Sequence, residues 1–255
     1  MIELFIMLVC TFSSVVGSIS GIGGGIIIRP TLEMVTPYNV ELVSFLSGCA
    51  VLSMAFVALG RRKKSTEFDY RKGTMMAVGS VCGGLAGKFI FSALSGKTLG
   101  KVQALVLIGI TFFLLVHLCL KKYIKPQNIH NPMICFLIGL VLGLVSAFLG
   151  IGGGPLNLAV LNYFLGLDLK KAAVYSLYII LFSQISSFLL MVILGTIPAF
   201  SWTVLACAVS GGIGGGFFGS WIGNRVQEKT VTFLYVSVLI FVLFVSGINL
   251  RSYIG

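Results

Sequence analysis

Ser20-Gly21-Ile22-Gly23-Gly24-Gly25 interrupts an apolar run near the start of the chain, and Leu149-Gly150-Ile151-Gly152-Gly153-Gly154 interrupts another run half-way along it. Glycine costs about 1 kcal/mol per residue in a helix interior, so each string ends one helix and lets another begin. The same break falls at the same point of each half. The sequence therefore predicts two matched repeats, about 1–125 and 126–255.

The sequence around these strings is that of a membrane protein. Hydrophobic residues make up 57% of the 255 residues and charged residues only 10%, against about 25% in soluble domains. Apolar runs fall at about 2–20, 24–36, 40–60, 73–95, 98–120, 132–149, 153–167, 171–195, 200–223 and 229–250. A helix of about 20 apolar residues spans a bilayer. We expect an all-α polytopic bundle of about 8–10 membrane segments, forming one transmembrane domain over residues 1–255.

The formal net charge of +11 indicates topology rather than nucleic-acid binding. Basic residues stand in short runs between apolar segments, such as Arg61–Lys64, as they do in cytoplasmic loops. If each broken segment is a hairpin that returns to its own side, Lys170, Lys171, Arg225 and Lys229 join that loop inside. If each broken segment crosses once, they fall outside. The positive-inside rule favours the hairpins, which makes the two halves inverted.

The glycine strings are also the first candidate substrate site. A helix that restarts after a break presents unpaired N–H groups and the positive end of its dipole, which together attract anions. Secondary transporters place their substrates between two such ends near the midplane. The residues concerned are Gly23, Gly24, Gly25, Gly152, Gly153 and Gly154. The alternative is that these glycines only permit tight helix crossing.

Two charged residues lie inside apolar segments. Arg29 follows the first string by about one turn, where it is placed to balance an anionic substrate; alternatively it pairs with Glu33, four residues on along the same helix face. Lys88 stands nearer a helix end. We expect its long side chain to reach the membrane interface.

Polar residues in the apolar segments complete the candidate site. Hydroxyl, thiol and amide groups suit the binding of a polar oxyanion, and the alternative is that they form hydrogen bonds between helices. The candidates are Ser47, Cys49, Asn157, Ser183 and Gln184.

The sequence offers nothing for an enzyme. No acidic residue falls in the middle of an apolar segment, and no paired-carboxylate, Ser/His/Asp or metal-ligand pattern is present. The six cysteines form no C-x-x-C pair and are expected to be packing residues. We therefore expect no catalytic residue, metal or cofactor. The expected partners are a small anion and the lipid bilayer, with no nucleic acid; the oligomeric state is left open.

The sequence resembles the sulfite exporter TauE/SafE family of membrane transporters over essentially the whole chain. The resemblance is carried by Ser20–Gly25 with Pro30 following, Leu149–Gly154, Arg61–Lys64, Gly219 and Gly223-Asn224-Arg225. The second repeat departs from the pattern, because Pro155 follows its glycines directly and Ala159 stands where the first repeat has Pro30. The resemblance implies a multi-pass carrier in the cell membrane for sulfur-containing anions such as sulfite, thiosulfate or organosulfonates.

Residues and resemblance together predict a secondary transporter that exports such anions by alternating access. A cell interior at about −100 mV favours anion exit by about 2.3 kcal/mol per charge, so an exporter needs no coupling ion. An ion-coupled uptake permease or an anion channel of the same fold is the alternative, and a non-transporting membrane scaffold is a third class.

Overall fold

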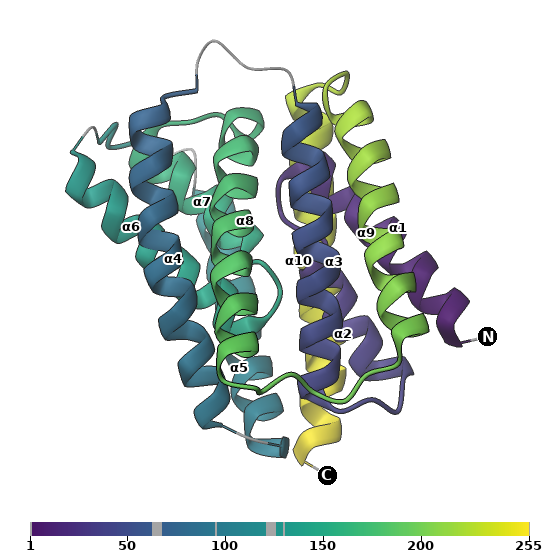
Figure 1. The fold of residues 1–255 in the computed structure, drawn as a ribbon. Helices are drawn as coiled ribbons and strands as arrows, with labels where there is room; N and C mark the ends of the chain where they lie inside the picture. The colour runs from purple at the N-terminus through teal and green to yellow at the C-terminus, as the bar shows by residue number, and fades with distance from the viewer. Residues whose placement is uncertain (1, 63–67, 95, 121–125, 130, 255) are drawn as a thin grey trace.

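The described residues fold into ten helices and no strand (Figure 1). The computed structural model describes residues 2–254 except 63–67, 95, 121–125 and 130, so Lys63 and Lys64 of the basic run lie outside it. The helices are α1 (Ile2–Ser20), α2 (Gly25–Val35), α3 (Val40–Arg61), α4 (Tyr70–Ala93), α5 (Gly96–Leu120), α6 (Pro132–Leu149), α7 (Gly154–Leu165), α8 (Leu169–Ile193), α9 (Trp202–Gly223) and α10 (Glu228–Ile254). They follow the predicted apolar runs closely.

Short polar residues fix where several of these helices begin. Asn39 accepts a hydrogen bond of 2.9 Å from the backbone N–H of Leu42 at the start of α3, and Asp168 accepts one of 2.7 Å from that of Lys171 in α8. Asp69 and Asn131 cap α4 and α6 in the same way. Such side chains satisfy N–H groups that have no partner inside the helix. The caps therefore mark the loop ends of the apolar segments.

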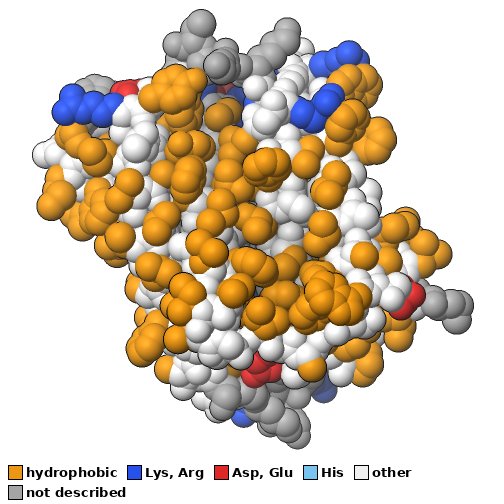
Figure 2. Space-filling view, viewed as in Figure 1, with side chains coloured by type: hydrophobic (Ala, Val, Ile, Leu, Met, Phe, Trp, Pro, Cys, Tyr) orange, Lys and Arg blue, Asp and Glu red, His pale blue; other side chains and the backbone are white. Residues whose placement is uncertain are grey.

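Eight of the described helices are long and apolar enough to cross a membrane, all except α2 and α7. These two have 11 and 12 residues, and at 1.5 Å per residue they reach only about half-way through a bilayer core. Large apolar side chains, among them Phe12, Phe56 and Trp202, are exposed on the outside, and Figure 2 shows them covering the middle of one face. The all-α polytopic prediction is confirmed.

The two halves run in opposite directions. In Figure 1 the chain enters α3 from the lower end and α8 from the upper end, and α4 and α9 are opposed in the same way. The α3–α4 connection and the starts of α8 and α10 therefore share the upper end, where Figure 2 shows blue Lys and Arg side chains. Lys170, Lys171, Arg225 and Lys229 thus lie at the same end as Arg61 and Arg62, as the hairpin topology predicted.

Glycine stripes fasten each half to the hairpin of the other. A β-carbon on Gly83 of α4 would lie 2.0 Å from the carbonyl oxygen of Leu140 in α6, and one on Gly215 of α9 would lie 2.6 Å from that of Thr11 in α1. Only glycine permits such close approach of backbones. Consequently α4 packs on α6 and α8, whereas α9 packs on α1 and α3. Figure 1 shows these two groups side by side.

Candidate functional site

The two glycine strings meet inside the bundle, backbone against backbone. A β-carbon on Gly154 would lie 1.3 Å from the carbonyl oxygen of Ile22, and one on Gly25 would lie 2.5 Å from that of Ile151. Gly23 and Gly152 have φ values of 80° and 84°, a left-handed conformation that side chains other than glycine rarely adopt. The strings are glycine-rich because the turn and the crossing both demand it.

This crossing covers the two helix starts that the sequence proposed for the anion. No side chain caps α2 at Gly24 or α7 at Gly153. Gly24 packs on the backbone of Ser13, and Gly153 packs on Ser146. The helix starts therefore face protein in this conformation. Binding of the substrate by Gly23–Gly25 and Gly152–Gly154 stays a prediction.

Asn157 and Ser176 support the first string. Ser176 Oγ donates a hydrogen bond of 2.7 Å to the carbonyl oxygen of Gly21, and Asn157 Nδ2 donates one of 3.2 Å to Ser176 Oγ. Asn157 is fully buried, and its Oδ1 has no partner among the described residues; Ser47 Oγ, on α3, is buried and unpartnered in the same sense. Asn157 thus stabilises the fold in this conformation, and its contact with substrate stays a prediction.

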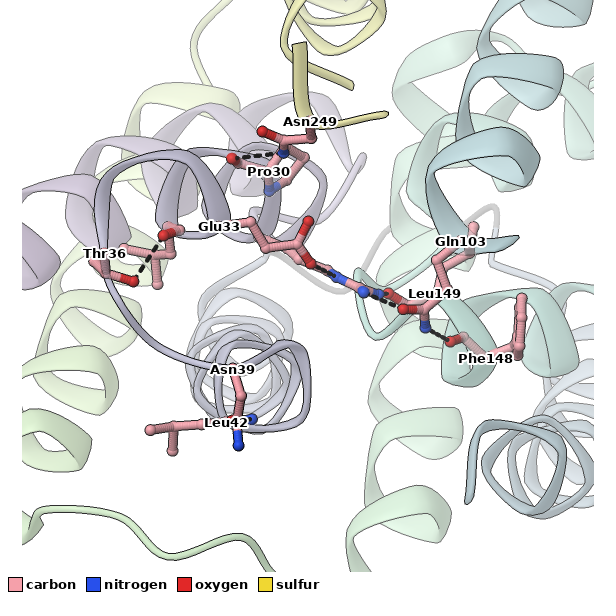
Figure 3. Close-up of polar contacts among 11 residues, drawn as sticks. Pro30, Glu33, Thr36, Asn39, Leu42, Gln103, Phe148, Leu149 and Asn249 are labelled. Carbon is pink, nitrogen blue, oxygen red and sulfur yellow. Dashed lines mark hydrogen bonds and ion pairs between the residues drawn. The ribbon is translucent and has the colours of Figure 1, made fainter. Parts of the chain in front are cut away.

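Arg29 is bound by protein groups on three sides. Its Nε lies 2.7 Å from Glu33 Oε1, the ion pair that the spacing allowed. The guanidinium also donates to the carbonyl oxygen of Leu149 and to Gln103 Oε1, and Gln103 Nε2 donates 2.5 Å to the carbonyl oxygen of Phe148. Figure 3 shows this chain of contacts. Arg29 therefore ties α2 to the C-terminal end of α6, where carbonyl groups lack helical partners.

A cavity of about 30 Å³ lies beside the tip of the α6–α7 hairpin, between α3, α4 and α8. Its lining residues are Ser44, Phe45, Gly48, Cys49, Leu52, Lys88, Phe91, Ala147, Gly150, Gln184, Ser187, Phe188 and Met191. A second cavity of about 20 Å³ on the other side of the tip includes Arg29, Glu33 and Ser246. A water needs about 10–15 Å³ of such volume, so the first cavity has room for about two waters and the second for about one.

Two of the predicted polar residues line the first cavity, and the others lie elsewhere. Cys49 and Gln184 line it, whereas Ser47, Ser183, Asn157 and Arg29 do not. Gln184 Nε2 lies 3.4 Å from Ser146 Oγ. Ser183 instead donates 3.0 Å to the carbonyl oxygen of Gly143, a hydrogen bond between helices.

Lys88 is the charged residue of this cavity, and the expectation that it extends to the membrane interface is wrong. Its side chain is only 7% exposed, and its ammonium lies 3.7 Å from the ring centre of Phe91. The packing of α4 on α8 accounts for this placement. Gly84 packs against Ser183 and Ser186 of α8, and Lys88, four residues later, lies on the same helix face.

At the opposite end of the bundle, Arg62 binds the tip of the other hairpin. Its Nη2 donates a hydrogen bond of 2.7 Å to the carbonyl oxygen of Ser18, near the end of α1. Burial lowers the pKa of Arg62 to about 10, so the side chain remains cationic at neutral pH. A cation therefore lies at each hairpin tip, and of Lys88 and Arg62 it is Lys88 that lines a cavity.

Comparison with known proteins agrees with this architecture. A family model described as "Sulfite exporter TauE/SafE" matches residues 6–248. The chain belongs to the TauE/SafE family. This TauE/SafE protein is 25% identical to the "Probable membrane transporter protein YunE" of Bacillus subtilis (strain 168) over 254 residues, 89% of this chain and 90% of that protein.

A second relative, a "Probable membrane transporter protein" of Haemophilus influenzae, is 26% identical over 191 residues, 72% of this chain and 70% of that protein. No solved structure gives a significant match. The TauE/SafE protein is thus a multi-pass membrane transporter, with its polar interior around the tips of two crossed hairpins.

Proposed function

We propose that this TauE/SafE protein is a secondary transporter that exports small sulfur-containing anions, such as sulfite, thiosulfate or organosulfonates, by alternating access. The observation that carries the proposal is the pair of crossed, oppositely directed hairpins in a chain whose family is described by sulfite export. Broken helices from inverted repeats that meet inside a bundle are the usual setting of a transporter's substrate site.

Export agrees with the charges of the interior. The buried ammonium of Lys88 favours an anion over a cation. The membrane potential then drives a monoanion outward by about 2.3 kcal/mol per 100 mV, with no coupling ion. The two cavities at the α6–α7 tip measure only about 30 and 20 Å³, so we expect passage of an anion to require the helices around the hairpin tips to part.

Flux measurements in proteoliposomes test the proposal. Vesicles loaded with sulfite or thiosulfate are expected to release it saturably when the purified protein is present, and faster when the starting side is negative. A Gly153→Val variant is expected to lose this flux, because Gly153 has a φ of 61° and packs on Ser146. Gly214→Val is the control, since nothing lies within 4 Å of a β-carbon there.

The outcomes separate the alternatives. Continuous conductance without saturation would identify a channel, and dependence on a sodium or proton gradient would identify a coupled permease. Absence of sulfite and thiosulfate flux, together with transport of a sulfur-free anion, would overturn the proposed substrate class. Unchanged flux in the Gly153→Val protein would show that the crossing of the two glycine strings is not part of the transport path.

A further inference from the structure

The cavity beside Lys88 can be compared with its counterpart in the other half of the same molecule. Gly150 packs on Ser44 as Gly21 packs on Ala173, and Gly152 packs on Val51 as Gly23 packs on Ile180. These matched contacts establish which residue of α3 corresponds to which residue of α8 in the two repeats. The correspondence between α4 and α9 is established in the same way, because Gly83 packs on Leu140 as Gly215 packs on Thr11.

In this register the polar lining is present at the tip of the α6–α7 hairpin and absent from the equivalent positions at the tip of the α1–α2 hairpin. The counterparts of Ser44, Gln184, Ser187 and Lys88 are Ala173, Ala55, Ala58 and Ser220. All four counterparts are buried, so the same packing position is stable with small side chains. The fold therefore does not require an ammonium, an amide and two hydroxyls at the tip of the α6–α7 hairpin.

These polar groups are also costly where they stand. A buried ammonium loses its hydration, and the face of an aromatic ring recovers only part of that loss. Glu41, at the start of α3, attracts the Lys88 charge, while Arg29 repels it. Lys88, Ser44 and Gln184 line one small space. The Ser44 hydroxyl is buried with no hydrogen-bond partner among the described residues, and the Gln184 amide has a second N–H besides the one that reaches Ser146.

We infer that Lys88, Ser44 and Gln184 form a binding site for a small oxyanion at the tip of the α6–α7 hairpin. The ammonium supplies the charge, and the hydroxyl and amide N–H groups bind separate oxygens of the ligand. This arrangement suits an anion with several oxygen acceptors better than a halide. That the oxyanion contains sulfur rests on the proposed function; the site itself does not.

Among the described residues, the tip of the α1–α2 hairpin has no equivalent cluster. Arg62, the counterpart of Met191 in the same register, donates to the carbonyl oxygen of Ser18 and is partly buried there. The charge of Arg62 is therefore paired with a carbonyl group at the C-terminal end of α1. The oxyanion site lies on the side of the bundle away from the basic loops, beside the ends of α4 and α8.

Binding to the purified full-length protein in detergent tests the site. Sulfite, thiosulfate, phosphate and chloride are titrated separately by calorimetry. We expect Lys88→Gln to weaken binding of the preferred oxyanion about tenfold or more, and Ser44→Ala about three- to tenfold, because a hydrogen bond to a charged ligand is lost. Lys88→Arg is expected to restore part of the affinity. Lys101→Gln removes a partly buried lysine of α5 near the same end and is expected to change affinity less than twofold.

Ser44→Ala is the variant that is not expected to disturb folding, because it removes a hydroxyl that has no partner among the described residues. Unchanged oxyanion affinity in both Lys88→Gln and Ser44→Ala overturns the site, as does a wild-type protein that binds none of the four anions. Lys88-dependent binding of phosphate alone supports the site and contradicts the sulfur substrate. Sulfite flux that survives Lys88→Gln supports the proposed function and overturns the site.

Discussion

Gly154, the first residue of α7, packs so closely on Ile22 that a β-carbon would lie 1.3 Å from the Ile22 carbonyl oxygen. Such an overlap with backbone cannot be relieved by turning a side chain. We expect Gly154→Ala to force the two hairpins apart and to lower the yield and melting temperature of the purified protein. Overpacking of this kind costs about 1–3 kcal/mol or more.

The control for Gly154→Ala is Gly214→Ala in α9. Nothing lies within 4 Å of a β-carbon at that position, and alanine favours a helix over glycine by about 1 kcal/mol. Its melting temperature is expected to equal or exceed that of the wild type. Equal melting temperatures for the Gly154→Ala and Gly214→Ala proteins would contradict the crossing.

A second prediction concerns the seam between α4 and α6. Gly83→Ala places a methyl group 2.0 Å from the carbonyl oxygen of Leu140, so we expect destabilisation of about 1–3 kcal/mol. Gly109→Ala in α5 is the matched control, because its surroundings are open. Unfolding monitored by circular dichroism would measure the difference, and a stable Gly83→Ala protein would count against close packing of these helices.

The breaks and the helices could be predicted from the sequence because their causes are local. A string such as Gly21–Gly25 cannot continue a helix, and apolar length defines each segment. The inversion of the halves followed from loop charge, as the placement of Lys170 and Arg225 at the end of Arg61 shows.

The placement of individual polar groups depends on which helix face turns inward, which the sequence of one helix does not determine. Lys88 was expected at the interface and is buried, because Gly84 brings that face of α4 against α8. For Arg29 the sequence left two possibilities, and its contact with Leu149 arises only from the approach of residues far apart in the chain.

Arg29 yields a third prediction. Arg29→Gln leaves Glu33 and the Leu149 carbonyl without their cation, and removal of one member of a buried ion pair costs about 3–5 kcal/mol. We therefore expect a marked loss of thermal stability. Arg71→Gln removes an exposed arginine and is expected to change stability by less than about 0.5 kcal/mol.

The same variant separates a structural from a substrate-binding role. Anion affinity, measured on the Arg29→Gln protein that remains folded, is expected to stay within about twofold of the wild type. A folded Arg29→Gln protein of unchanged stability and greatly weakened anion binding would instead identify Arg29 as the substrate's counter-charge.

The last prediction places the two ends of the bundle in the membrane. Single cysteines are introduced at exposed Arg71, Thr196 and Gln227 in a cysteine-free protein and probed in whole cells with an impermeant thiol reagent. Because both hairpins return to their own side and the basic loops lie inside, only the cysteine at 196 should react before the cells are opened, and all three afterwards. If each broken segment crossed the membrane once, the cysteine at 227 would react in intact cells and the one at 196 would be protected.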